Sequence, residues 1–266
     1  MSSPMSTRRI KGVVLQQAYV MKHSPLRLME MLYWPLIEVV LWGFIASYLE
    51  GRSQLPGGVA ILLGAVVIWD VCFRTQQELA MSQLMDMWDR SILNLYASPM
   101  RQSEYVVGSI LFSFARVIIG TTLLAVFVAI SFDFSILDVG ATLVPAFLIL
   151  LGFGWGLGLL IRATVLRFGS NAEVLAWSLA LLIQPAAAVF YPVDSLPGWL
   201  QPISHAIPVS HVFEAARHFL AREEVLWGEL AIGGALDLVY LAAGAFVLSI
   251  AYRSVRVRGL LSRPGY

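Results

Sequence analysis

The stretch VVGSILFSFARVIIGTTLLAVFVAI (Val106–Ile130) contains a single charged residue, Arg116. A helix needs about 20 mostly apolar residues to cross the hydrocarbon core of a bilayer. The stretch shows no alternation of polar and apolar residues, which the strands of a membrane barrel require. It is therefore predicted to be a transmembrane helix.

The composition of the whole chain agrees with this prediction. Of its 266 residues, 58% are hydrophobic and 13% are charged, whereas soluble domains carry about 25% charged residues. The mean hydropathy is +0.75. A soluble fold of this length would lack polar surface, so the chain is predicted to be an integral membrane protein. The single cysteine, Cys72, excludes an internal disulfide.

Five more stretches are apolar enough to span a membrane, and they bring the predicted fold to an all-α polytopic membrane protein with six transmembrane helices. They are Met31–Leu49, Gly57–Phe73, Val139–Ile161, Val174–Tyr191 and Leu230–Ala251. We expect one membrane domain over residues 1–266, with an N-terminal interfacial helix (1–28), a six-helix body (29–252) and a cytoplasmic tail (253–266).

The N-terminal segment and the distribution of basic residues set the expected orientation. Apolar residues from Ile10 to Met21 recur at helical spacing, which favours a helix in the membrane interface over a frayed basic tail. Lysine and arginine concentrate in the loops on the cytoplasmic side of membrane proteins. Both termini are therefore predicted to be cytoplasmic, because most basic residues lie in four segments on one side: Arg8, Arg9, Lys11, Lys22 and Arg27; Arg74, Arg90 and Arg101; Arg162 and Arg167; Arg253, Arg256, Arg258 and Arg263.

The loop between the second and third predicted spans is mostly polar from Thr75 to Glu104, so the second helix is expected to continue into the cytosol. A short helix is predicted next, ending at Ser98-Pro99 because a residue before proline avoids helical backbone angles. Its apolar residues could form a docking surface for a partner or could pack on the chain itself: Ile92, Leu93, Leu95 and Tyr96.

The connection from Pro192 to Gly228 is the longest segment on the predicted outer side. Its prolines divide it into short pieces, and Trp199 suits the outer membrane interface. We expect short helices that turn back toward the membrane. The residues singled out in this external segment are Pro192, Pro197, Trp199, Pro208, Glu214 and Arg217.

Two motifs bear on enzymatic chemistry. A phosphate-binding P-loop needs glycines followed by lysine, but the chain's lysines are Lys11 and Lys22 and neither follows a glycine. The run GFGWGLG (Gly152–Gly158) is predicted to allow close helix contact rather than to bind a nucleotide, since it lies within an apolar span. No nucleotide site of the P-loop type is expected.

His211, Glu214 and His218 share one helical face, and such a set could hold a metal ion. The competing interpretation, which we favour, is that these residues form the polar face of a short external helix. No metal and no cofactor is therefore expected in this chain, although an intramembrane metal-dependent enzyme stays open as an alternative function.

Four ionisable residues fall within the predicted spans, where such groups are costly and usually form pairs or line a polar path. They are Glu38, Asp70, Arg116 and Asp237. Glu38 and Arg116 lie at similar depths from the cytoplasmic side, so they are expected to form an ion pair. Asp70 is expected near the inner end of its helix, within reach of water.

Two segments and the order of the parts resemble the permeases of type-2 ATP-binding-cassette exporters. The segments are DMWDRSILNLYASPMRQSEYVVGSIL (Asp86–Leu111) and YPVDSLPGWLQPISHAIPVSHVFEAARHFL (Tyr191–Leu220). The likeness covers nearly the whole chain. One departure is Asp89-Arg90-Ser91, which stands where the family often has Glu-Gly-Thr.

The resemblance implies a transport subunit that is not itself an enzyme. The loop after the second span would carry a coupling helix that docks on a separate ATPase, which binds the ATP and magnesium. The coupling residues it implies are Asp86, Trp88, Asp89, Arg90, Ile92, Leu93, Leu95, Tyr96, Ser98 and Pro99. The implied partners are two ATPase subunits and a second permease, either another copy or a sister chain, in the cell (inner) membrane.

No stretch selects the cargo. Aromatic residues in the predicted spans, such as Trp34 and Trp177, suit a hydrophobic or amphipathic substrate such as a lipid or a drug. A polysaccharide or a lipid-linked glycan is the alternative, because aromatic side chains also contact sugars.

Overall fold

The computed structural model describes residues 5–52, 58–88 and 100–258. These residues form α-helices and three short 3-10 helices, and no strand occurs among them. The α-helices are α1 (Thr7–Lys22), α2 (Pro25–Gly51), α3 (Gly58–Trp88), α5 (Gln102–Phe132), α6 (Leu143–Phe168), α7 (Glu173–Ala186), α8 (Gln201–His205), α9 (Pro208–Arg222) and α10 (Trp227–Arg258). The 3-10 helices are η1 (Ile136–Thr142), η2 (Gly169–Ala172) and η3 (Val193–Ser195).

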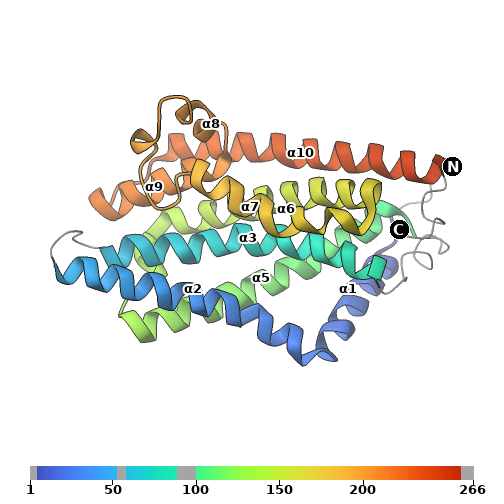
Figure 1. Ribbon diagram of the computed structural model, residues 1–266, viewed down its shortest axis with the longest axis horizontal. Helices are drawn as coiled ribbons and strands as arrows, with labels where there is room; N and C mark the ends of the chain where they lie inside the picture. The colour runs from blue at the N-terminus through green and yellow to red at the C-terminus, as the bar shows by residue number, and fades with distance from the viewer. Residues whose placement is uncertain (1–4, 53–57, 89–99, 259–266) are drawn as a thin grey trace.

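The long helices run side by side along the longest axis of the molecule (Figure 1). The central helix is α6, which packs against α3 on one side and α10 on the other. In turn α3 contacts α2 and α5, while α1 packs on α5 and α9 packs on α10. α1 and the C-terminal end of α10 lie at one end of the bundle, and α8 and α9 lie at the other.

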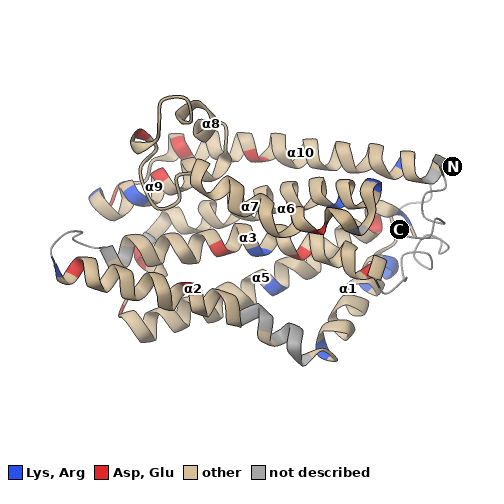
Figure 2. Cartoon of the chain, in the orientation of Figure 1, with Lys and Arg blue, Asp and Glu red and all other residues tan. Residues whose placement is uncertain are grey.

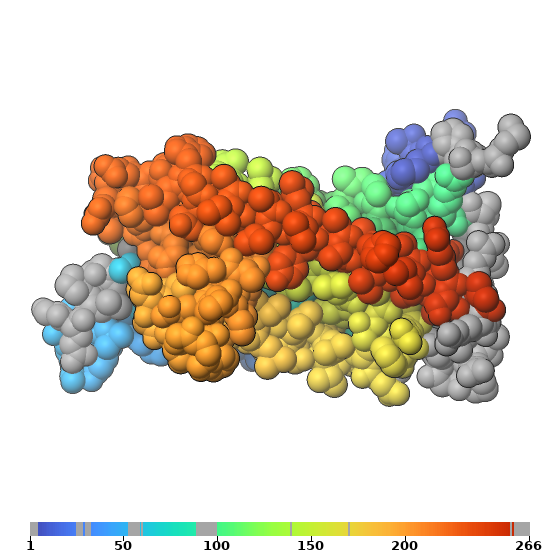
Figure 3. Space-filling model, turned by 90° about the horizontal axis from the view of Figure 1, so that it is seen from above, coloured from blue at the N-terminus to red at the C-terminus, as the bar shows by residue number. Residues whose placement is uncertain are grey.

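Three helices are long and apolar enough to cross a membrane: Gln102–Phe132, Gly140–Phe168 and Trp227–Val255. Within the apolar window of each, 67% of α6 is buried in the chain, against 22% of α5 and of α10. α6 is therefore the inner helix, whereas the others offer long apolar faces to their surroundings. Figure 3 shows α10 exposed along its length, with the segment around α8 beside it. An all-helical membrane protein is the fold that these observations support.

The glycine-rich run in α6 serves helix packing, as predicted. A Cβ atom added to Gly154 or Gly158 would lie 2.7 Å from a Cβ atom of α3, in Thr75 and Leu79 respectively. On the other face, a Cβ atom on Gly156 would lie 3.1 Å from the backbone of Tyr240 in α10. Small residues at both faces let α6 approach two neighbours closely.

α7 ends at Ala186, five residues before the expected end of the fifth span at Tyr191. Pro185 lies in its last turn, and a proline there obstructs the carbonyl of the turn before it. Ala188 then adopts a positive φ of 51°, and the chain turns away from the helix axis. With 14 residues, α7 is about 21 Å long at a rise of 1.5 Å per residue.

The polar residues that follow Phe73 do not end the helix. α3 continues without a break to Trp88, and Arg74, Gln76 and Gln83 are buried in it. The amide nitrogen of Gln76 donates to the backbone carbonyl of Ala176 in α7 at 2.9 Å. The helix thus continues past Phe73 as expected, and several of its polar side chains are buried against neighbouring helices. Its location in the cytosol stays a prediction.

Charged residues lie in the middle of the bundle as well as at its ends (Figure 2). Arg74 and Arg162, which we assigned to loops from the sequence, belong to α3 and α6 and are buried. These two arginines are therefore removed from the loop residues on which the predicted orientation depends. The cytoplasmic location of the termini remains a prediction based on the other basic residues.

Candidate functional site

The predicted coupling segment joins α3 to α5. Two of its residues belong to the described structure: Asp86, which accepts a hydrogen bond from the Tyr105 hydroxyl, and Trp88, which is 47% exposed. The hydrogen bond ties the end of α3 to the start of α5. The other eight predicted coupling residues lie outside the described residues: Asp89, Arg90, Ile92, Leu93, Leu95, Tyr96, Ser98 and Pro99.

Glu104, in the first turn of α5, anchors the N-terminal helix beside this segment. Its side chain is fully buried. One carboxylate oxygen accepts the Ser6 backbone N–H at 2.8 Å, and the other accepts the Arg101 backbone N–H at 2.9 Å. The Arg9 guanidinium lies 3.4 Å from the second oxygen. Sequence analysis missed this role, although an acidic residue in a first helical turn is a recognisable signal.

The rest of α1 packs along α5. Val13 is fully buried over Gly108, where an added Cβ atom would lie 2.6 Å from the Val13 Cβ atom. One turn further along α1, the Gln17 amide donates to the Ser109 hydroxyl at 3.0 Å. The N-terminal segment is therefore helical, and its inward face contacts the helix that leaves the predicted coupling segment. Its place in the membrane interface stays a prediction.

We expect Glu104→Ala to loosen α1 from α5, because two backbone N–H groups and Arg9 lose their acceptor. Cleavage of the purified protein by trypsin within α1 should accelerate about tenfold, the effect of losing one or two hydrogen bonds to a charged acceptor. The rate is measured from the shortening of an N-terminally tagged chain.

The control for this experiment is Glu173→Ala. Glu173 also lies in a first helical turn, that of α7, and makes no hydrogen bond or ion pair within the described ranges. It should leave the cleavage rate unchanged. Equal rates for Glu104→Ala and the unmodified chain would contradict the anchoring role.

The ionisable residues of the predicted spans are paired differently from our expectation. Arg116 forms its ion pair with Glu78 of α3, not with Glu38, so the predicted Glu38–Arg116 pair is wrong. α3 extends past the expected end of the second span and packs against α5, which brings Glu78 level with Arg116. Glu38 makes no hydrogen bond or ion pair with any described residue.

Asp70 is also placed differently. It is buried in the middle of α3 and pairs with Arg74 one turn later. Nη2 and Nε of Arg74 lie 2.8 Å and 3.0 Å from one Asp70 oxygen. Asp70 therefore has an arginine partner rather than contact with water.

Asp237 of α10 is 7% exposed, and its side chain lies against Gly152 of α6. An added Cβ atom there would overlap its carboxylate group. One Asp237 oxygen has no hydrogen-bond partner within the described part of the chain. Asp237 stays a candidate intramembrane polar site.

The segment predicted to be external folds into η3, α8 and α9, so it consists of short helices as expected. Its location on the outer side and its return toward the membrane stay predictions. Glu214 of α9 accepts the Val193 backbone N–H and an Arg217 N–H, each at 2.8 Å. Arg217 also donates to the Ala188 carbonyl at 3.0 Å. The Glu214–Arg217 ion pair therefore stabilises the change in chain direction that follows α7.

The remaining residues predicted in that segment lie at its turns and surface. Pro192 precedes η3 and Pro208 begins α9. The carbonyl of Pro197 accepts the Leu200 N–H at 2.8 Å. Trp199 is 72% exposed, as a side chain at the outer interface would be.

The hypothetical metal set is not brought together. The two ring nitrogens of His211 face acceptors, the Glu229 carboxylate at 2.6 Å and the His205 carbonyl at 2.9 Å. Neither nitrogen has a lone pair directed at a metal. His218 contacts the carbonyl of Glu224. In the part of the chain that the structure describes, no group of three His, Cys, Asp or Glu side chains could hold a metal ion.

A shallow hollow runs along α2. It is widely open, and its space of about 880 Å³ is bounded by side chains of α2 alone. None of its lining residues is charged, and two tyrosines stand near its two ends: Tyr33, Leu36, Ile37, Val40, Leu41, Phe44, Ile45, Tyr48 and Leu49. This face of α2 is suited to an apolar occupant.

A known protein family matches most of the chain. Residues 25–220 match the family model described as ABC-2 type transporter. The match runs from the start of α2 into α9 and includes the predicted coupling segment and the external segment. No curated protein sequence matches the chain.

Proposed function

Because the chain belongs to the ABC-2 type transporter family, whose members are membrane components of transporters, we propose that it is the permease subunit of an ATP-binding-cassette exporter. We propose six spans, formed by α2, α3, α5, α6, α7 and α10, in the cell (inner) membrane. Their even number would leave both termini on one side, the cytoplasmic one. In support, α1 and the end of α10 lie at the same end of the bundle (Figure 1).

The length of α3 carries the proposed mechanism. Its 31 residues extend about 46 Å, well beyond a hydrocarbon core of about 30 Å. α3 thus projects toward the predicted coupling segment, and α5 returns from it. Motion of a docked ATPase at this segment would pass directly into two long helices and, through Glu104, into α1.

The energy source in this proposal is a separate ATPase. The sequence has no glycine-rich loop followed by lysine, and two ATPase subunits would bind ATP and magnesium on the cytoplasmic side. A second permease, either a copy or a sister chain, would complete the transport pathway.

We propose a hydrophobic or amphipathic cargo. The uncharged hollow along α2 supports this class, because buried polar substrates need partners for their hydrogen-bonding groups. With two permeases facing each other along α2, the hollow would line the path between them.

The docking role is tested with Leu93→Asp and Tyr96→Asp. A charge placed in an apolar contact is costly, so each change should reduce the ATP hydrolysis that co-purifies with the tagged permease by about tenfold or more. The measurement is ATP turnover in the eluate after purification from cells that also express the ATPase.

Leu93→Met and Tyr96→Phe are the matched controls, and both should retain ATP turnover. Membrane insertion is checked by size-exclusion chromatography of the detergent-solubilised protein. Full turnover in the eluates of both aspartate variants would count against the docking assignment.

A further inference from the structure

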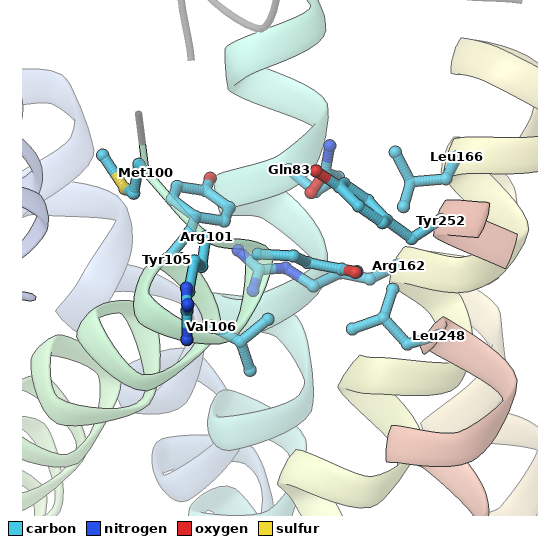
Figure 4. A pocket seen from close by; sticks show the side chains of 10 residues that line it. Gln83, Met100, Arg101, Tyr105, Val106, Arg162, Leu166, Leu248 and Tyr252 are labelled. Carbon is cyan, nitrogen blue, oxygen red and sulfur yellow. The ribbon is translucent and has the colours of Figure 1, made fainter. Parts of the chain in front are cut away.

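A small cavity lies between α3, α5, α6 and α10, at the end of the bundle that holds α1. Figure 4 shows the side chains that line it. Its volume is about 20 Å³, which is room for about one water-sized group. None of its residues is among the ten predicted coupling residues or lines the hollow along α2, although Met100 and Arg101 come from the connection between α3 and α5.

Arg162 of α6 is fully buried in the wall of this cavity. Nη2 donates to the hydroxyls of Ser82 at 2.7 Å and Ser109 at 3.1 Å. The guanidinium carbon lies 4.9 Å from the centre of the Tyr105 ring, within the range of a cation–π contact. Nε and Nη1 have no acceptor among the residues that the structure describes.

No carboxylate of a described residue forms an ion pair with Arg162. In this respect it differs from Arg74 and Arg116, which have acidic partners. A buried charge without a counterion is strongly unfavourable. The Arg162 environment is therefore incomplete without an additional anionic or polar group.

Gln83 of α3 lines the same cavity and shows the same deficit. It is 4% exposed, and its amide nitrogen has no acceptor within the described ranges. Two buried side chains from different helices thus contribute unused N–H donors to one space. These donors need a hydrogen-bond acceptor, and the charge on Arg162 favours an anionic one.

The other walls of the cavity indicate which anion it takes. Val106, Leu166 and Leu248 are apolar, Tyr252 is amphiphilic, and Arg101 adds a second basic side chain to the lining. A polar interior beside apolar walls, near the ends of membrane helices, matches a lipid headgroup and the first part of its acyl chains. An oxygen of the headgroup would fill the cavity while the rest of the phosphate stays at its mouth.

We propose that Arg162 and Gln83 form a binding site for a phosphate group, that of a membrane phospholipid in the cytoplasmic leaflet. The leaflet assignment rests on the proposed orientation, whereas the phosphate chemistry does not. A bound lipid would join α3, α5, α6 and α10 at the end where the coupling segment attaches.

The test compares lipid retention by the purified full-length chain in native mass spectrometry. Phosphatidylglycerol and diacylglycerol with the same acyl chains are added in equal amounts. The unmodified chain should retain phosphatidylglycerol about tenfold better, as one strong hydrogen bond to a charged group predicts. Arg162→Met should abolish the preference and Gln83→Leu should reduce it several-fold.

Arg167→Met is the matched control, because Arg167 lies on the same helix but is exposed. It should keep the preference. A second arm measures thermal unfolding with inorganic phosphate and no lipid. One outcome separates the two sources of phosphate: inorganic phosphate stabilises the unmodified chain but not Arg162→Met, and the chain shows no preference for phosphatidylglycerol. That outcome would keep the phosphate site but overturn the phospholipid as its source.

The whole proposal is overturned if neither phosphatidylglycerol nor inorganic phosphate responds to the two substitutions. It is also overturned if Arg162→Met leaves lipid retention unchanged but releases the ATPase, since a partner carboxylate would then occupy the cavity. Should Arg162→Met not yield folded protein, Gln83→Leu decides, because it removes a donor without removing a charge.

Discussion

Gly154→Ala is expected to destabilise the protein by about 3 kcal/mol, the upper range for overpacking a close helix contact. The added methyl group would lie 2.7 Å from the Thr75 Cβ atom and 2.8 Å from the Cys72 carbonyl oxygen. The carbonyl belongs to the α3 backbone and cannot rotate away. α3 and α6 would have to separate along their whole contact.

The measurement is the free energy of unfolding in mixed micelles, with Gly234→Ala as the control. Gly234 also lies inside a long helix, α10, and an added Cβ atom there meets nothing within 4 Å. Alanine favours a helix over glycine by about 1 kcal/mol, so this variant should be at least as stable as the unmodified chain. Equal stabilities for the two variants would refute the close contact.

Asp70→Leu is expected to cost about 3–5 kcal/mol, the penalty for removing one partner of a buried ion pair. Arg74 would keep its charge in the interior of α3 without the carboxylate 2.8 Å away. The double variant Asp70→Leu/Arg74→Met should recover most of this loss, because buried pairs can be replaced by apolar residues at little cost.

A double-mutant cycle on unfolding free energies isolates the interaction between the two side chains. Glu38→Leu is the control within the predicted spans, since Glu38 has no ion pair among the described residues. It should not lower stability. Additive losses in the Asp70 and Arg74 variants would show that the pair is not coupled.

The all-helical architecture and several packing features could be predicted from the sequence because they depend on local composition. The apolar run of Val106–Ile130 has too few polar groups for any surface in water, and α5 contains it. The glycines of Gly152–Gly158 predicted close contacts because small residues have that effect on any helix face. The short helices after Pro192 followed from proline's restrictions on the backbone.

The candidate site was less accessible to sequence analysis. The partner of Arg116 depends on how α3 and α5 are rotated and shifted relative to each other, and depth counted along separate spans favoured Glu38 over Glu78. Glu104 gained its role from Ser6 and Arg9, which are nearly one hundred positions away in the chain.

The sequence by itself determined that this protein lies in lipid rather than in water, and therefore that its chain is helical. Both follow from the balance of apolar and charged residues within single segments. What the tertiary structure decided is which buried polar groups meet: Arg116 with Glu78, Asp70 with Arg74, and Arg162 with no acid among the described residues. These contacts depend on how helices that are distant in the sequence pack together. A shift of about an ångström makes or breaks a hydrogen bond, and the periodicity of a single segment does not encode the position of its neighbours to that precision.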